Sequence, residues 1–197
     1  MISRITVFIT GASIMILEIL GVRIVASQLG TTIIVWSTMI STIITSLAIG
    51  YYIGGALADR TLSHSVRASI IFLAGITVAL IVPLRSLVFA VGVSLPYGLR
   101  ALIASTILFA IPTILLAMIT IYTLRMETKK ISEIGSINGT FYALSTFGSI
   151  VGVFLTSFYL IPTFRLSSIL FIVSGLLLTV SIIPSLLYAL SPTKTTS

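Results

Sequence analysis

The sequence predicts an all-α, polytopic membrane protein with about six transmembrane helices. Two observations predict this fold class. Of the 197 residues, 57% are hydrophobic and 8% are charged, whereas roughly a quarter of the residues in a soluble domain are charged. The apolar residues also form long runs without the strict alternation of a barrel strand. We therefore expect the lipid bilayer to be the solvent of this chain, with no soluble domain.

Six apolar segments are long enough for a helix to cross a bilayer, which takes roughly 20 residues. The first is expected to be an uncleaved helix rather than a signal peptide, because it is long and contains Glu18 and Arg23. The third is expected to break at Pro83, before a short interfacial segment between Arg85 and Arg100. Within a single transmembrane domain covering residues 1–197, the expected spans are about 5–26, 32–58, 68–84, 101–123, 139–161 and 166–190.

Lysine and arginine residues predict the orientation. With a cytoplasmic N-terminus, the inner side holds Arg4, Arg60, Arg67, Arg125, Lys129, Lys130 and Lys194, and the other side holds Arg23, Arg85, Arg100 and Arg165. The larger number of lysine and arginine residues on the inner side predicts a multi-pass cell-membrane protein with both termini in the cytoplasm. Its longest cytoplasmic loop would then run from Arg125 to Ser136. The net charge of +7 then reflects topology and contact with anionic headgroups, and we expect no nucleic-acid partner.

Three of the spans carry a stripe of small, weakly polar side chains at helical spacing. Such a stripe is typical of close helix packing, in which hydroxyl groups bond back to their own backbone. The alternative is a water-filled path between the helices. The stripes consist of Thr38, Ser41, Thr42 and Thr45; of Thr106, Ala110, Thr113, Ala117 and Thr120; and of Tyr142, Ser145, Ser149, Gly152 and Thr156.

Two GxxxG motifs occupy matching places in the chain. Gly50 and Gly54 lie in the second span, and Gly148 and Gly152 lie in the fifth. The motif allows helices to approach closely, within one chain or between chains. If the six spans are divided three and three, both motifs fall in the middle helix, which favours two three-helix repeats of the kind found in transporters.

Glu18 is a carboxylate near the middle of the first span. A charge there costs several kcal/mol unless it is paired, so we expect it to face the bundle interior. Arg23 is about 140° further around the helix than Glu18, so a direct ion pair between the two would be strained. We expect Arg23 instead to lie near the end of the span and to extend its guanidinium to the membrane surface. Glu18 is then either protonated or paired with another cation, such as Arg85 or a cationic substrate. A structural lock, hydrogen-bonded to hydroxyl groups of the second or fourth span, is an equal alternative.

Four stretches resemble the membrane domain of spermidine-synthase-like membrane proteins, which is related to the major facilitator superfamily. The resemblance covers nearly the whole chain, in order, through GASIMILEILGVRIVASQLGTTIIVW, IGYYIGGALADR, IPTILLAMITIYTLR and NGTFYALSTFGSIVGVFLTSFYLIP. Facilitator transporters have two six-helix halves, and this chain resembles one of them. The resemblance implies a substrate face left open in a single chain, with the stripes and glycines of the second and fifth spans as dimer surfaces.

Within this resemblance, the stretch from Gly55 to Arg60 is similar to the loop that braces the cytoplasmic side of facilitator transporters. Asp59 and Arg60 match its acidic and basic residues, and Arg67 would be its distal basic residue. Leu62 and Ser63 stand where the family has a glycine and a basic residue. The other interpretation is a helix-terminating turn with Asp59 near the start of the next helix.

We expect no enzyme activity, cofactor or metal. The family often carries a fused aminopropyltransferase domain with a glycine-rich loop and several carboxylates. The only acidic residues here are Glu18, Asp59, Glu127 and Glu133, His64 is the only histidine, and cysteine is absent. These residues supply neither a nucleophile–base pair nor a nucleotide loop.

Two functions follow as hypotheses. The first is a transporter-like or ligand-holding subunit, acting as a homodimer on a small, cationic or amine-bearing solute. Glu18 would be its coupling (proton) or amine-binding carboxylate, and the hydroxyl groups of the second and fourth spans would line the path. The second is a non-catalytic anchor or structural subunit for a separate soluble, aminopropyltransferase-like protein or a larger membrane complex, docked through the basic loop from Arg125 to Lys130.

Overall fold

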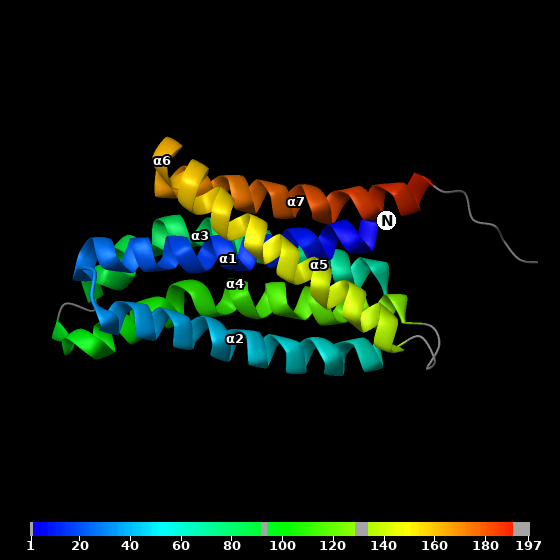
Figure 1. Cartoon of the computed structure of the whole chain (residues 1–197), viewed down its shortest axis with the longest axis horizontal. Coiled ribbons are helices and arrows are strands. Elements are labelled where there is room, and N and C mark those ends of the chain that lie inside the picture. The colour runs from blue at the N-terminus through cyan, green and yellow to red at the C-terminus, as the bar shows by residue number, and fades with distance from the viewer. Residues whose placement is uncertain (1, 92–93, 129–133, 191–197) are drawn as a thin grey trace, which may run out of the picture.

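The structure, a computed structural model, describes residues 2–91, 94–128 and 134–190. These residues form helices without any strand, in agreement with the predicted all-α class (Figure 1). A π-helical turn, labelled η3, continues α5. The elements are α1 Ile2–Leu29, α2 Ile33–Arg60, α3 His64–Val91, α4 Tyr97–Glu127, α5 Ile134–Leu155, η3 Thr156–Leu160, α6 Ile161–Thr163 and α7 Leu166–Leu190.

The helices have the length and composition of membrane spans. α1, α2, α3, α4 and the segment Gly135–Thr163 are each long and apolar enough to cross a bilayer. The described side chains of α7 add a shorter apolar helix. The expected spans at 5–26 and 101–123 lie inside α1 and α4, and the expected span 32–58 begins one residue before α2. The architecture is that of a multi-pass helical bundle compatible with an integral membrane protein.

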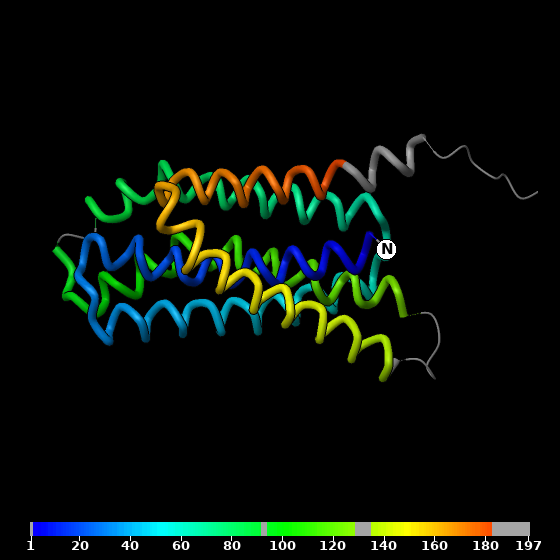
Figure 2. Tube along the Cα trace, turned by 45° about the horizontal axis from the view of Figure 1, so that its top comes forward, coloured from blue at the N-terminus to red at the C-terminus, as the bar shows by residue number. Residues whose placement is uncertain are grey.

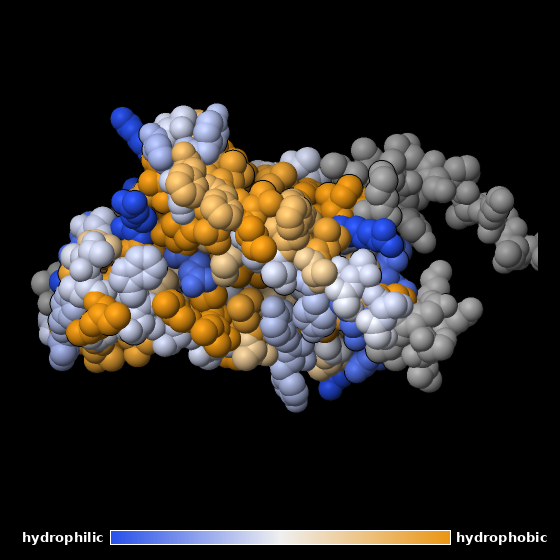
Figure 3. Space-filling view, in the orientation of Figure 1, coloured by the Kyte–Doolittle hydropathy of each residue, from blue (hydrophilic) through white to orange (hydrophobic). Residues whose placement is uncertain are grey.

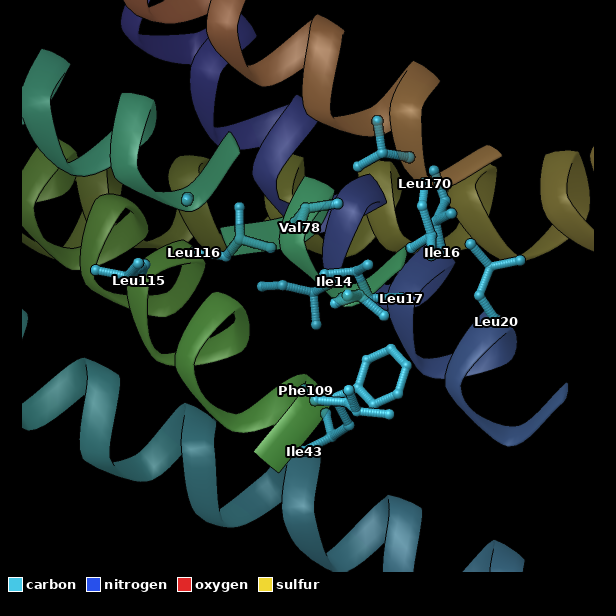
Figure 4. Close-up of a cluster of buried hydrophobic side chains, with 14 of the residues drawn as sticks. Ile14, Ile16, Leu17, Leu20, Ile43, Val78, Phe109, Leu115, Leu116 and Leu170 are labelled. Carbon is cyan, nitrogen blue, oxygen red and sulfur yellow. The ribbon is translucent and has the colours of Figure 1, made fainter. Parts of the chain in front are cut away.

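α1 and α4 form the centre of the bundle and are its most buried long helices. Figure 4 shows Phe109 of α4 near Leu17 and Leu20 of α1, and Leu116 of α4 beside Val78 of α3. Leu17, Leu20, Phe109, Leu116 and Val78 are each no more than 2% exposed, so these side chains form a continuous apolar core. The peripheral helices α2, α3, α5 and α7 pack around this pair (Figure 2).

Both GxxxG motifs lie at contacts within the chain. A Cβ on Gly54 would come within 2.8 Å of Met118 Cα on α4, and one on Gly50 would meet the carbonyl oxygen of Ile114. A Cβ on Gly152 would lie 2.5 Å from the carbonyl oxygen of Ala12 on α1. The two glycine faces are therefore filled by α4 and α1, and the expectation that these glycines form dimer surfaces is wrong.

The third span differs from its expected form. α3 continues through Pro83 to Val91, so neither the expected break nor the start of an interfacial segment at Arg85 is found. Pro83 lies on an exposed side of α3, so its ring has few contacts with the neighbouring helices. The helix continues through it because the residues that follow are again apolar. α4 likewise contains Pro112 without ending there.

The expected cytoplasmic loop from Arg125 to Ser136 is shorter than predicted. α4 extends to Glu127, and α5 already begins at Ile134. Residues 129–133, which include Lys129, Lys130 and Glu133, lie outside the described part of the chain. The loop prediction failed because polar residues at the end of a helix were counted as loop residues, although helix ends routinely extend past the apolar stretch.

Candidate functional site

Glu18 faces the side of α1 between α2 and α5. Gly11 contacts Ser145 of α5, and Gly21 contacts Met39 of α2. Glu18 is about 20° around the helix from Gly11 and about 60° from Gly21, so it lies between these contacts. Its side chain is partly exposed and, among the described residues, has neither a hydrogen bond nor an ion pair.

A cavity of about 590 Å³ lies between α1, α2 and the end of α5, and we call it the α2–α5 pocket. Its residues come from α1, from the start of α2 and from the end of α5 with η3 and α6. Glu18 is not one of its lining residues, but Ile19 follows it directly, and Val22, one helical turn later, lies within about 40° of it around α1. The lining residues are Ile19, Val22, Arg23, Ala26, Thr31, Trp36, Val153, Ser157 and Ile161.

α2 and α5 are inclined to each other rather than parallel. They converge at the end of the bundle that holds the N-terminus and diverge toward the other (Figures 1 and 2). Tyr51 on α2 and Tyr142 on α5 lie toward this converging end. Figure 3 shows the face bearing α2 and α5, where apolar side chains dominate and the hydrophilic ones gather mainly toward the ends.

Three pocket features were not predicted as site residues. Arg23, expected only as an end residue, lines the pocket, as does Trp36, the only tryptophan of the chain. The π-helical turn Thr156–Leu160 also borders it through Ser157. π-Helical turns occur frequently at functional sites, but no residue pattern in the sequence marks this one. A tryptophan within an apolar run likewise resembles an ordinary interfacial residue.

The predicted hydroxyl groups do not line the α2–α5 pocket. Thr42 lies 3.4 Å from Thr106 of α4, measured between the hydroxyl oxygens, and the Thr38 hydroxyl donates to its own backbone at Val35. Thr45 is exposed and lines a small cavity of about 220 Å³ between α2 and α4, together with Thr42 and Thr106. Thr113 is fully buried in the bundle. The stripes of α2 and α4 therefore meet each other, which is the helix-packing interpretation.

Arg85 is not the partner of Glu18. It lines a different cavity with Ser27 and Gln28 of α1. Ser27 is nine residues after Glu18 and so about 180° around α1. The expected pair fails because the two side chains lie on different sides of α1, which sequence spacing within either helix does not reveal.

The residues of the expected cytoplasmic brace make contacts between helices at the N-terminal end of the bundle. Asp59 of α2 pairs with Arg125 of α4 at 3.2 Å, while Arg60 is exposed. Arg67 of α3 is only 2% exposed, and its Nη1 donates to Ser3 Oγ of α1 at 3.1 Å. Ser3 Oγ in turn donates to Glu127 Oε1 of α4 at 2.6 Å. These contacts tie α1, α2, α3 and α4 together.

Tyr122 of α4 holds the turn between α2 and α3, a role that the sequence did not indicate. Its side chain is fully buried, its hydroxyl donates to the Thr61 carbonyl at 2.6 Å, and it accepts from the Ser63 backbone N–H at 2.8 Å. In the sequence it is one more aromatic residue in an apolar run, which indicates core packing and nothing more. A buried phenol needs such partners, and here they fix the turn.

We expect Tyr122→Phe to lower the free energy of unfolding by about 1–2 kcal/mol, because the turn's buried polar groups lose their partner. Thermal unfolding in detergent, followed by circular dichroism, measures this loss. Tyr52→Phe is the matched control, since Tyr52 is 79% exposed and makes no hydrogen bond within the described chain. Equal melting temperatures for the two variants would contradict the role given to Tyr122.

Comparisons of the chain with family models, with curated proteins and with solved structures find no match. Site residues are therefore placed by the geometry of this chain. That geometry places the guanidinium of Arg23 and the indole of Trp36 in the α2–α5 pocket, while the neighbouring mid-span carboxylate of Glu18 has no partner among the described residues.

Proposed function

We propose that this chain is a transporter-like or ligand-holding membrane subunit for a small, amine-bearing solute bound in the α2–α5 pocket. The observation that carries the proposal is Glu18, a partly exposed carboxylate without a protein partner among the described residues. Such a group facing lipid would cost several kcal/mol. Water and a cationic group in the pocket would remove that cost, and an ammonium group is the simplest such cation.

Two pocket residues narrow the solute. The indole of Trp36 attracts cations through the face of its ring. Arg23 supplies a guanidinium, which suits a carboxylate. The rise from Glu18 to Arg23 along α1 is about 7.5 Å. A small solute that carries both an amine and an acid group fits these charges better than a bare cation does.

The glycine contacts support a half-transporter architecture of two three-helix repeats. Gly50 and Gly54 of α2 meet Ile114 and Met118 of α4, and Gly148 and Gly152 of α5 meet Phe8 and Ala12 of α1. In both cases two glycines four residues apart meet two residues four apart on a helix that runs in the same direction. If α1, α2 and α3 correspond to α4, α5 and α7, the two contacts are equivalent.

A second copy of the chain is the proposed cover for the open pocket. Large aromatic side chains are exposed on α5 and η3, where Phe147 is 59%, Phe154 58% and Phe158 75% exposed. These rings would suit either lipid or a protein partner, but Glu18 on the same side favours protein. The resemblance to one half of a facilitator transporter agrees with such a pair.

The experiment that tests this function is solute binding and uptake by the purified protein in proteoliposomes. The probes are radiolabelled alanine, a zwitterion, putrescine, a diamine, and succinate, which has no amine. We expect alanine to exceed both other solutes, and succinate to match empty liposomes. Equal signals for alanine and succinate would contradict the proposed pocket chemistry.

A further inference from the structure

We infer that a second site, at the end of the bundle opposite the N-terminus, binds an anion that carries a phosphate group. A cavity of about 640 Å³ lies there between the last turns of α1 and α3 and the first turn of α4 (Figure 1). Its size is in the usual range for small-molecule sites. Its polar lining consists of Ser27 and Gln28 of α1, Arg85 and Ser86 of α3, and Arg100 of α4.

Two guanidinium groups share this cavity without a protein counter-charge. Arg85 has no hydrogen bond or ion pair within the described residues. Arg100 donates from Nη2 to the Phe89 carbonyl at 3.3 Å, but its Nε is buried and has no partner. A buried donor on a charged group that lacks an acceptor is costly, so the arrangement favours a bound acceptor.

The acidic residues of the described chain are all too far away to neutralise these arginines. Asp59 and Glu127 lie at the N-terminal end of the bundle, where α2 and α4 end. Glu18 projects from another side of α1 than Ser27, about 180° away. Arg100 also sits in the first turn of α4, where the helix dipole is positive and adds to the local positive potential.

The remaining donors match phosphate oxygens. Ser27 and Ser86 donate to their own backbones, at Ile24 and Pro83, which leaves the Gln28 amide and the two guanidinium groups as free donors. Guanidinium groups bind phosphate with two parallel hydrogen bonds, and two of them from different helices can bracket one phosphate. The phosphate could belong to a lipid headgroup or to a free anion, because the cavity lies at an end of the bundle where both are present.

The test uses the full-length protein and measures two kinds of binding. Native mass spectrometry after purification in phosphatidylglycerol counts retained lipid, and calorimetry in lipid-free detergent measures the affinity for inorganic phosphate. The main variant is Arg85→Gln, which removes a side chain without hydrogen bonds in the described structure and so leaves the fold intact. Arg100→Gln is the second variant. Arg165→Gln is the matched control, because Arg165 is an exposed arginine between α6 and α7 at the same end of the bundle.

We expect Arg85→Gln and Arg100→Gln each to weaken binding about tenfold or more, since each removes charge-assisted hydrogen bonds, while Arg165→Gln binds as the wild type does. Retained phosphatidylglycerol that depends on both arginines would identify a lipid headgroup. Binding of inorganic phosphate alone, with the same dependence, would identify a soluble anion. Absence of both, or binding that is equal in the wild type and both variants, would overturn the inference. This site is independent of Glu18, so its failure would leave the proposed function untouched.

Discussion

Replacing Gly148 and Gly152 of α5 with alanine is expected to prevent the protein from reaching a folded, monodisperse state in detergent. The new Cβ at position 148 would collide with the carbonyl oxygen of Phe8, and the one at 152 would lie 2.9 Å from Ala12 Cα. Both obstacles are backbone atoms of α1, which cannot rotate away as a side chain can. Overpacking of this kind costs about 1–3 kcal/mol at each site, and here both sites push the same helix pair apart.

Size-exclusion chromatography and thermal unfolding measure this effect. Gly139→Ala is the matched control, because it makes the same change on the same helix, where the added methyl group meets no atom within 4 Å. Alanine favours a helix by about 1 kcal/mol over glycine, so the control should be as stable as the wild type or more so. A double variant that melts with the control would show that α5 does not rest on α1 through these glycines.

Glu18→Gln is expected to reduce alanine binding about a hundredfold while leaving the fold intact. The amide keeps the size of the carboxylate but removes the charge that the solute's amine needs, and the loss of such a charge pair costs several kcal/mol. Glu18 has no hydrogen bond in the described structure, so its replacement breaks no contact within the protein. Scintillation proximity binding and thermal unfolding are measured on the same sample.

Asp59→Asn is the matched control, since it makes the same chemical change at the end of the bundle. Its ion pair with Arg125 is exposed, with side chains 70% and 51% accessible, and such pairs contribute little. If Glu18 instead stabilises the packing of the helices, the effects on alanine binding and on melting temperature should be reversed. In that case Glu18→Gln would lower the melting temperature and leave alanine binding unchanged.

The fold class could be predicted from sequence because it depends on a local quantity. Hydrophobic length decides whether a segment can span a bilayer, and α1, α2 and α7 correspond closely to the apolar runs. Pro83 shows the limit of local rules. A proline removes one backbone hydrogen bond wherever it occurs, but whether the helix then breaks depends on the residues and helices around it.

The candidate site could be predicted only in part, because contacts between helices are not local. The position of Glu18 in mid-span indicated a special carboxylate, yet the neighbour on each side of α1 is decided by how α2 and α5 pack. The same reason explains why Arg85 was paired with Glu18 and why Thr113 was expected beside it. The GxxxG motifs predicted close approach, but a glycine pair carries no information about which helix will fill it.

Cysteine accessibility at position 18 is the most direct test of whether Glu18 faces an aqueous, ligand-accessible pocket. The chain has no cysteine, so Glu18→Cys introduces a single thiol. In native membranes a small charged methanethiosulfonate reagent reacts only with a thiol that water reaches, because the thiolate is the reactive form. We expect Glu18→Cys to be modified and to react far faster than Ile107→Cys on the exposed apolar side of α4. Equal and negligible labelling of both positions would mean that lipid or packed protein surrounds residue 18, and would contradict a solute pocket there.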